Sequence, residues 1–330
     1  MRALRSPKLP IFFHIFLLLI FDILIVVYAS PDLQITVNTD KQTYWSNDLV
    51  HIYGDLKRDG APITDALVAV QVSDAQNNIV SIRTCSTGTT PSPWSITITE
   101  LISCDQSGNP KGTFAKGTLA YFKITVKNLN TLSERYVKVT INLYDSNQVP
   151  FGMAWVGITV GPDKEFTYLT SIPVPSDASI GTAYAFANAY NKWPKDNGIA
   201  YCGEEAVAFT ITDGASLSSS NDPTSSESTG SEGIYQLTFK LSNKPALGDH
   251  SVYASYYQAL ATAILDVVWL FTDLDRNGKV DVLDIALAAK AYGSYLGHPR
   301  WNPKADLDGN GAIDILDIAK VARDFGEKRT

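Results

Sequence analysis

The sequence predicts a mainly β protein, with immunoglobulin-like β-sandwich domains followed by a small all-α module. Three observations support this fold class. Short segments of alternating apolar and polar residues recur between turn-forming residues from residue 32 to residue 268, as they do in β-sandwiches. Apolar residues at helical spacing then follow each of two acidic repeats in the last sixty residues. The length of 330 residues leaves room for two or three domains.

The chain begins with the pattern of a secretory signal peptide, which we expect to span residues 1–29. Three basic residues precede a long apolar run, and Ala29 ends a plausible cleavage site. The alternative is an uncleaved membrane anchor, because the run is nearly long enough to span a bilayer. Asp22, near the middle of the run, would cost about 2.5–3.5 kcal/mol on insertion scales. Both interpretations place the rest of the chain outside the cytoplasm, secreted or at the extracellular cell surface.

The first predicted sandwich combines two separated parts of the chain, residues 32–90 and residues 233–268. The strands that we expect run over residues 33–37, 49–54, 66–72, 234–241, 250–256 and 261–268. The first part lacks the last strands of a sandwich, and the second has too few strands to form a core alone. We therefore expect one discontinuous sandwich. The alternative is three sandwich-like units in series, of which the last is degenerate.

The second predicted sandwich, residues 93–212, is inserted in a loop of the first. We expect its strands over residues 94–98, 119–126, 137–144, 153–160, 182–190 and 206–211. Cys104 lies early in this unit and Cys202 late, so they are our candidate disulfide, which leaves Cys85 free. The sequence leaves other connectivities open. Residues 213–232 are rich in Ser, Thr and Gly and are expected to form a flexible loop.

Two acidic segments, residues 273–284 and 306–317, share one sequence pattern, and each fits a twelve-residue calcium loop. Their offset is 306 − 273 = 33 residues. Gly278 and Gly311 occupy the sixth position, where the chain turns sharply. We expect two calcium ions, bound through positions 1, 3, 5, 7, 9 and 12 of each loop. These candidate ligands are Asp273, Asp275, Asn277, Lys279, Asp281 and Asp284, then Asp306, Asp308, Asn310, Ala312, Asp314 and Asp317. The alternative is a pair of solvated acidic turns.

A helix is expected after each loop and before neither. Apolar residues at positions 283, 285, 286, 289 and 292 follow the first loop, and those at 316, 318, 319, 322 and 325 follow the second. Gly293 and Gly326 stand where helix ends are expected. Pro299 and Pro303 oppose a helix before the second loop.

With both loops and exit helices, residues 271–330 resemble a dockerin domain, a calcium-dependent module that binds cohesin domains. The resemblance implies a cohesin-type partner and an extracellular assembly, often for polysaccharide breakdown. It also implies partner contacts at loop positions 10 and 11, and two basic residues further along the helices are candidates for contacts at the rim. The residues concerned are Val282, Leu283, Lys290, Ile315, Leu316 and Arg323. Many dockerins have a hydroxyl residue in the paired positions, so the aliphatic pairs are a departure. The alternative is that the two leucines pack the helices together and that the basic residues are merely solvated.

Weaker resemblances concern the β units. The run over residues 39–62 resembles the opening strands of macroglobulin-like domains, and residues 93–212 resemble immunoglobulin-like adhesion modules by pattern.

The sequence contains no catalytic motif that we recognise, and a net charge of −7 provides no basic footprint for nucleic acid. The non-loop carboxylates of Glu100, Glu165, Glu204 and Glu205 are interpreted as solvated charges. We therefore expect a non-catalytic docking protein. The alternative is a carbohydrate-binding or adhesion protein that uses aromatic side chains on the β units, here Tyr184, Phe186, Tyr190 and Trp193. Exposure of that row favours sugar binding, and burial favours docking.

Overall fold

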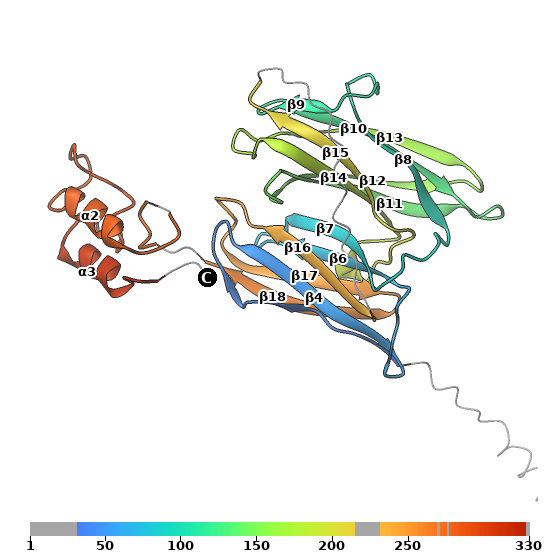
Figure 1. Cartoon of the computed structure of the whole chain (residues 1–330), viewed down its shortest axis with the longest axis horizontal. Helices are drawn as coiled ribbons and strands as arrows, with labels where there is room; N and C mark the ends of the chain where they lie inside the picture. The colour runs from blue at the N-terminus through green and yellow to red at the C-terminus, as the bar shows by residue number, and fades with distance from the viewer. Residues whose placement is uncertain (1–31, 215–231, 269–270, 276, 328–330) are drawn as a thin grey trace, which may run out of the picture.

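The computed structural model describes residues 32–214, 232–268, 271–275 and 277–327. The predicted signal peptide and most of the Ser-rich segment lie outside these residues. Strands are the main secondary structure of the described chain, and its α-helices occur only at the C-terminus (Figure 1). The predicted fold class is therefore confirmed. No helix among the described residues is long and apolar enough to cross a membrane.

The first β unit has two sheets, and each combines strands from both ends of the β region. One sheet has the order β1-β4-β16, with β2 and β5 also paired to β4. The other has the order β3-β18-β17-β6-β7. The strands are β1 (Leu33–Ile35), β2 (Asn38–Thr39), β3 (Thr43–Tyr44), β4 (Leu49–Arg58), β5 (Ala61–Pro62), β6 (Leu67–Ser73), β7 (Ile79–Ser86), β16 (Ile234–Lys240), β17 (Gly248–Tyr256) and β18 (Ala259–Val267).

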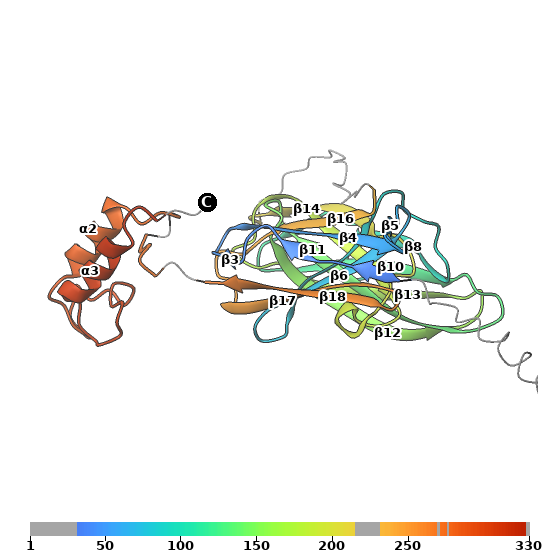
Figure 2. The same cartoon turned by 90° about the horizontal axis from the view of Figure 1, so that it is seen from below.

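Pairing of β16 with β4 and of β17 with β6 joins segments that are far apart in the sequence. Buried residues from both segments, such as Ile52, Val70, Phe239 and Val252, belong to one core cluster. On these pairings we propose that residues 32–90 and 233–268 form one discontinuous domain. Figure 2 shows its two sheets as layers seen from the side, with β4 and β16 above β17 and β18.

The second β unit lies between these segments in the sequence and also has two sheets. Their orders are β13-β10-β8 and β12-β11-β14-β15-β9. The elements are β8 (Ile96–Cys104), β9 (Thr113–Ala115), β10 (Leu119–Asn128), β11 (Arg135–Tyr144), β12 (Pro150–Val160), β13 (Glu165–Pro173), β14 (Gly181–Tyr190), the short 3₁₀ helix η1 (Pro194–Asp196) and β15 (Glu205–Thr212). Strands β7 and β13 were not predicted.

Strand β14 is two-faced, as its alternation predicts. Its four alanines, which include Ala183 and Ala187, are fully buried in the core of the second unit. The opposite side of the strand faces the first unit, because Phe186 belongs to that unit's core cluster. Phe186 and Tyr190 are buried, and Tyr184 is half-buried. The predicted aromatic platform is therefore largely an interface between the two units, and not a free surface.

On the other side of this interface, strand β7 of the first unit contributes polar side chains. Ser81 Oγ lies 2.5 Å from Tyr144 Oη, and Asn142 Oδ1 accepts a 2.6 Å hydrogen bond from the backbone of Ile82. Arg83 donates through Nε to Glu204 Oε2 at 2.7 Å and through Nη2 to Oε1 at 2.5 Å. The prediction that Glu204 is a solvated charge is wrong, since it forms a buried ion pair across the interface.

The predicted Cys104–Cys202 bridge is not formed, because all three cysteines are free and buried. Cys202 contacts the backbone of Ile98, and Cys104 stands six residues further along the same strand, β8. At about 3.3 Å per residue that separation is about 20 Å, whereas a disulfide requires Cα atoms within about 7 Å. The prediction rested on the early and late positions of the two cysteines in the sequence of the second unit, and these positions do not place the two thiols close together in space.

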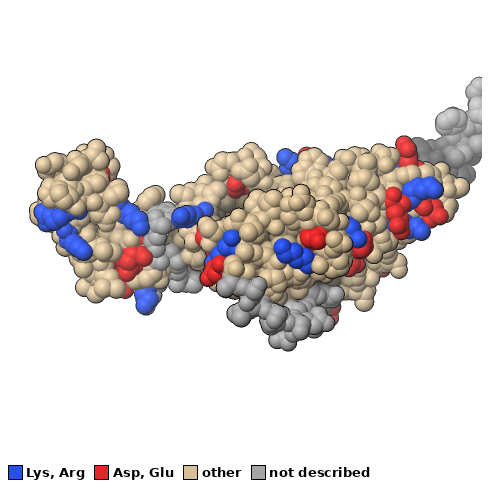
Figure 3. Space-filling view, turned by 90° about the horizontal axis from the view of Figure 1, so that it is seen from above, with Lys and Arg blue, Asp and Glu red and all other residues tan. Residues whose placement is uncertain are grey.

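The C-terminal module has its own core and two helices, α2 (Val282–Ala291) and α3 (Ile315–Arg323). Its core cluster consists of Leu274, Val280, Ala288, Ala291, Ala305, Ile313 and Val321. The cluster contains no residue of either β unit. Basic and acidic side chains are interspersed on the face drawn in Figure 3, so that face carries no broad patch of one sign.

Candidate metal centres and helix faces

Each acidic loop brings three carboxylates together. Oxygens of Asp273, Asp275 and Asp284 lie within 4.8 Å of one another, and so do those of Asp306, Asp308 and Asp317. Asp284 and Asp317 are fully buried. Like charges this close, and partly withdrawn from water, repel one another unless a cation neutralises them. The clusters are therefore candidate cation sites.

The last aspartate of each loop is fixed by backbone donors. Asp284 Oδ1 accepts from the Leu274 N–H at 2.6 Å, and its Oδ2 accepts from the Asp281 N–H at 2.8 Å. In the second loop, Leu307 and Asp314 donate to the equivalent carboxylate at 2.7 and 2.9 Å. This carboxylate thus ties the start of its loop to the start of its helix.

The sixth position requires glycine in both loops. Gly278 has φ 92° and Gly311 has φ 84°, a left-handed conformation that is strained for residues with a Cβ. In this conformation the Gly278 N–H donates to Asp273 Oδ2 at 2.9 Å, and the Gly311 N–H donates to Asp306 Oδ2 at 3.0 Å. The turn therefore folds the loop back over its first carboxylate.

The donor set fits a hard cation. Asp306 Oδ1 is buried and has no hydrogen-bond partner among the described residues, and a metal ion would satisfy it. The clustered groups are carboxylates, the oxygen ligands that Ca²⁺ prefers, and no thiol or imidazole joins them in the described chain. Dockerin-type calcium binding is compatible with these clusters, while the number of ions stays a prediction.

Asp281 and Asp314, the expected ligands at position 9, act as helix N-caps. Their Oδ1 atoms accept from the backbone of Leu283 at 2.8 Å and of Leu316 at 2.7 Å. Each completes a capping box with the last aspartate of its loop, an arrangement that stabilises the first helical turn. Neither belongs to the carboxylate clusters. A ligand role through water stays a prediction, as does coordination by the carbonyls of Lys279 and Ala312.

Asn277 and Asn310, at position 5, order their loops locally. Asn277 Oδ1 accepts from the Lys279 N–H at 3.0 Å, and Asn310 Oδ1 accepts from the Ala312 N–H at 2.7 Å. Each amide oxygen keeps a second lone pair, so these contacts leave the predicted ligand role open.

The two halves of the module are joined reciprocally. The Gly293 N–H, after α2, donates to the Ile313 carbonyl at 2.8 Å, and the Gly326 N–H, after α3, donates to the Val280 carbonyl at 2.8 Å. Ile313 in turn donates to Ser294, as Val280 does to Glu327. All four contacts obey the 33-residue offset of the sequence. Each loop is therefore held by the end of the other half, which couples the two sites structurally.

The helices present aliphatic side chains to solvent where the partner contacts were expected. The exposed fractions are 65% for Val282, 55% for Leu283, 61% for Ile315 and 57% for Leu316. The alternative that the two leucines pack the helices together is therefore wrong. The helices meet instead through other residues, including Ala288 and Val321. The predicted basic rim residues are also exposed; Arg323 Nε pairs with Asp324 Oδ1 at 2.7 Å, and this hydrogen bond lowers the pKa of Asp324.

Comparison with known proteins identifies the C-terminal module. Residues 271–326 match the family model described as the dockerin type I domain. No curated protein matches the chain. Among solved structures, the C-terminal domain of wzt is 12% identical, covering 40% of this chain and 87% of that one, with a TM-score of 0.31. A CARDB domain from Pyrococcus furiosus is 16% identical over 37% of this chain and 97% of that one, with a TM-score of 0.26. A β-glucosidase from Listeria innocua is 11% identical over 38% of this chain and 16% of that one, with a TM-score of 0.25. Such low scores support no inference about function.

Proposed function

Since residues 271–326 are a dockerin type I domain, we propose that the protein is a non-catalytic extracellular component that docks to a cohesin-type partner. Dockerin domains bind calcium and cohesin domains, and they occur in extracellular proteins. The observation that carries the proposal is the exposure of an aliphatic pair at the start of each helix, directly after a carboxylate cluster. We further propose that the protein is secreted or displayed at the cell surface, in an assembly linked to polysaccharide breakdown.

The proposed mechanism couples metal binding to presentation of the helices. Bound calcium would offset most of the negative charge of the three carboxylates in each loop, so that the ordered loop suffers much less electrostatic repulsion. Asp284 and Asp317 transmit that order to the helices, because they bond both to the loop backbone and to the capping residue. The ordered helix starts then hold Val282, Leu283, Ile315 and Leu316 in water, where a complementary apolar partner surface can cover them.

The reciprocal contacts and the 33-residue offset give the module two equivalent faces. Either face can meet the same partner surface after a half-turn of the module. We therefore propose two docking orientations, one centred on Leu283 and the other on Leu316.

A leucine-to-aspartate series tests this docking face. Leu283→Asp or Leu316→Asp alone should weaken cohesin binding only about twofold, because the other orientation remains. Together they should remove a central anchor from both orientations, at a cost of about 2 kcal/mol or more, which is a roughly 30-fold loss of affinity. Isothermal titration calorimetry with a type I cohesin domain measures this loss, and calcium binding should be unchanged.

Leu296→Asp is the matched control. Leu296 is also exposed, at 74%. It lies in the segment that connects α2 to α3 and belongs to neither aliphatic pair. Unchanged cohesin affinity in the Leu283→Asp, Leu316→Asp double variant would contradict the proposed face. An equal loss in the Leu296→Asp control would show that any added charge on the module impairs docking.

A further inference from the structure

The seam between the two β units contains a groove made of two neighbouring cavities. One has a volume of about 400 Å³ and the other about 150 Å³. Leu67 and Pro91 line both, so the two cavities share a wall. The larger volume alone falls within the range of about 300–1,000 Å³ that is usual for ligand pockets. The groove is separate from the C-terminal module.

Aromatic rings surround the smaller cavity. Trp94 and Tyr257 are each 51% exposed, and Tyr256, which also lines the cavity, is half-buried. Trp94 comes from the second β unit, whereas Tyr256 ends β17 of the first unit and Tyr257 begins the turn to β18. Large aromatic faces left in water at a cavity rim are costly to expose, and they typically mark a binding surface.

These rings are already held in place. Trp94 Nε1–H donates to the Ala200 carbonyl at 3.1 Å, and its indole packs against Tyr201 at a centroid distance of 4.8 Å. Tyr257 packs edge-on against Tyr256, also at 4.8 Å. Its φ of 49° is a left-handed conformation that is unfavourable for a bulky residue. Because the rings are ordered in advance, a ligand would lose little entropy in fixing them.

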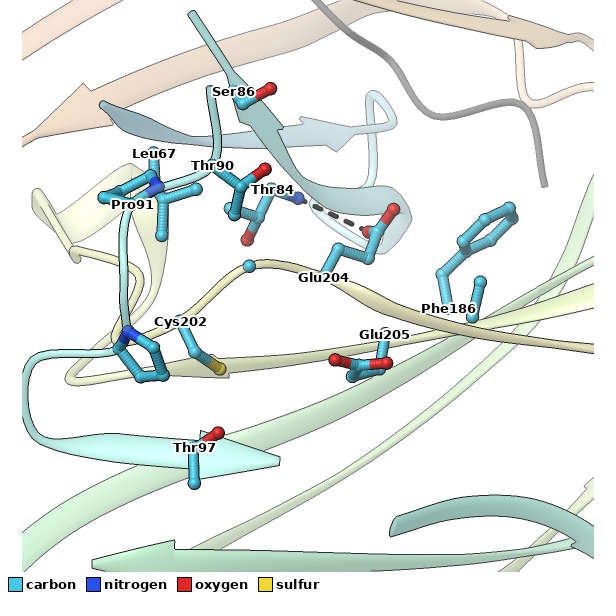
Figure 4. Close-up of a pocket in the computed structure, with 13 residues that line it drawn as sticks. Leu67, Thr84, Ser86, Thr90, Pro91, Thr97, Phe186, Cys202, Glu204 and Glu205 are labelled. Carbon is cyan, nitrogen blue, oxygen red and sulfur yellow. Dashed lines mark hydrogen bonds between the residues drawn. The ribbon is translucent and has the colours of Figure 1, made fainter. Parts of the chain in front are cut away.

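The larger cavity is lined mainly by hydroxyl and carboxylate groups. In Figure 4, Thr84 and Thr90 lie on one side of the pocket, with Thr97 and Glu205 on the other. Glu204 also lines the pocket and accepts a hydrogen bond from the Thr84 N–H at 3.4 Å (Figure 4), and Arg83 compensates its charge. Burial, and then the neighbouring charge of Glu204, raises the pKa of Glu205. The cavity thus offers hydrogen-bond partners along its length.

The charges of the groove disfavour anions and covalent chemistry. Glu205 and Asp65, one in each cavity, would repel a phosphate or carboxylate ligand. The Arg83 guanidinium is engaged by Glu204. Cys202 lines the larger cavity, but burial raises the pKa of its thiol to about 12, so it is not a reactive thiolate. A neutral ligand with many hydroxyl groups meets these constraints.

We propose that this groove binds a neutral saccharide chain, with Trp94 and Tyr257 as stacking platforms. Pyranose rings present faces of C–H groups, which carry a partial positive charge and pack on the negative faces of aromatic rings. Their hydroxyls donate to carboxylates such as Glu205 and exchange hydrogen bonds with the threonines. Two adjacent cavities, one rimmed by aromatic rings and the other lined by polar groups, suit successive sugar units. Extended peptides fit less well, because the site offers carboxylates and hydroxyls where a peptide backbone requires a paired strand edge.

This inference does not depend on the docking function. The predicted row of Tyr184, Phe186, Tyr190 and Trp193 is largely buried or half-buried, and the groove uses a different set of rings. Saccharide binding should also persist in EDTA, since no residue of either carboxylate cluster lines the groove.

The test is affinity gel electrophoresis of the full chain in four soluble neutral polysaccharides. They are hydroxyethylcellulose, arabinoxylan, galactomannan and mixed-linkage β-glucan, each with and without EDTA. At least one should retard the protein. Trp94→Ala and Tyr257→Ala should each lower affinity about tenfold or more, and their combination should abolish retardation. Trp94→Phe, which keeps a ring but loses the hydrogen bond to Ala200, should retain most of the binding.

Trp155→Ala is the matched control, because Trp155 is 47% exposed but lies on β12, outside the groove. It should bind like the unmodified protein. The proposal is overturned if none of the four polysaccharides retards the chain, or if the double variant still binds. It is also overturned if the Trp155→Ala control loses as much affinity as the groove variants, or if a basic or proline-rich peptide binds at the groove where no saccharide does.

Discussion

Replacing Asp273 and Asp306 together by alanine is expected to abolish calcium-dependent ordering of residues 271–327 and all measurable cohesin binding. Each aspartate is the first carboxylate of its cluster and accepts the N–H of the loop glycine. Among the described residues, the hydrophobic core of the module has seven buried members, so its folding should depend on the free energy of metal binding. Amide dispersion in two-dimensional NMR, with and without calcium, measures the ordering.

The two β units should remain folded in this double variant, because their cores share no residue with the module. Asp74→Ala is the control. It removes a carboxylate that accepts the backbone N–H groups of Gln76 and Asn78 in a hairpin turn of the first unit, and calcium affinity should not change. Undiminished calcium affinity in the Asp273→Ala, Asp306→Ala protein would contradict the loop assignment.

Glu204→Leu is expected to destabilise the β units by about 3–5 kcal/mol, because it leaves the buried guanidinium of Arg83 without its counter-ion. The side chains of Arg83 and Glu204 are 7% and 12% exposed. The guanidinium carbon also lies 3.3 Å from the centroid of Phe186, so it cannot turn out to water without breaking the interface. Burial is the largest single influence and lowers the pKa of Arg83, but the charge and hydrogen bond of Glu204, together with Tyr144 and Cys85, outweigh it and leave the pKa raised. Urea unfolding, followed by tryptophan fluorescence, measures the loss.

Arg83→Met in the Glu204→Leu background should recover much of this stability, since an apolar pair can replace a buried ion pair at little cost. Glu100→Leu provides the control. Its partner, Lys123 at 2.9 Å, is 28% exposed, and Glu100 itself is 37% exposed, so the expected loss is below about 1 kcal/mol. A cost for Glu204→Leu no larger than that of Glu100→Leu would show that the ion pair does not hold the units together.

The carboxylate clusters of the two acidic loops could be predicted from the sequence because their geometry is local. All clustered carboxylates of one site come from twelve consecutive residues, and a left-handed glycine folds them together. Most strands could be predicted for a similar reason, since alternation reports burial on one face. Strand β7 was missed because its buried residues include Ser81 and Arg83. Their burial follows from contact with the second unit, which no local pattern reveals.

The exposed face of α2 could not be predicted by periodicity. Nearly all its residues are apolar, from Val282 to Ala291, so spacing alone does not say which side faces the core. The structure turns Ala288 inward and Leu283 outward, because the capping box and the buried Asp284 fix the first turn. The pairing of Cys202 with Cys104 failed for a related reason: order in the sequence does not give position along a strand.

The most direct test of the central claim is calcium titration of the full chain after removal of metal with EGTA. Isothermal titration calorimetry should give two ions per chain, and circular dichroism should report a gain of helix over the same range of calcium, as α2 and α3 become ordered. A chain that binds no calcium, or that binds it without gaining helix, would contradict the account that metal binding orders the docking faces.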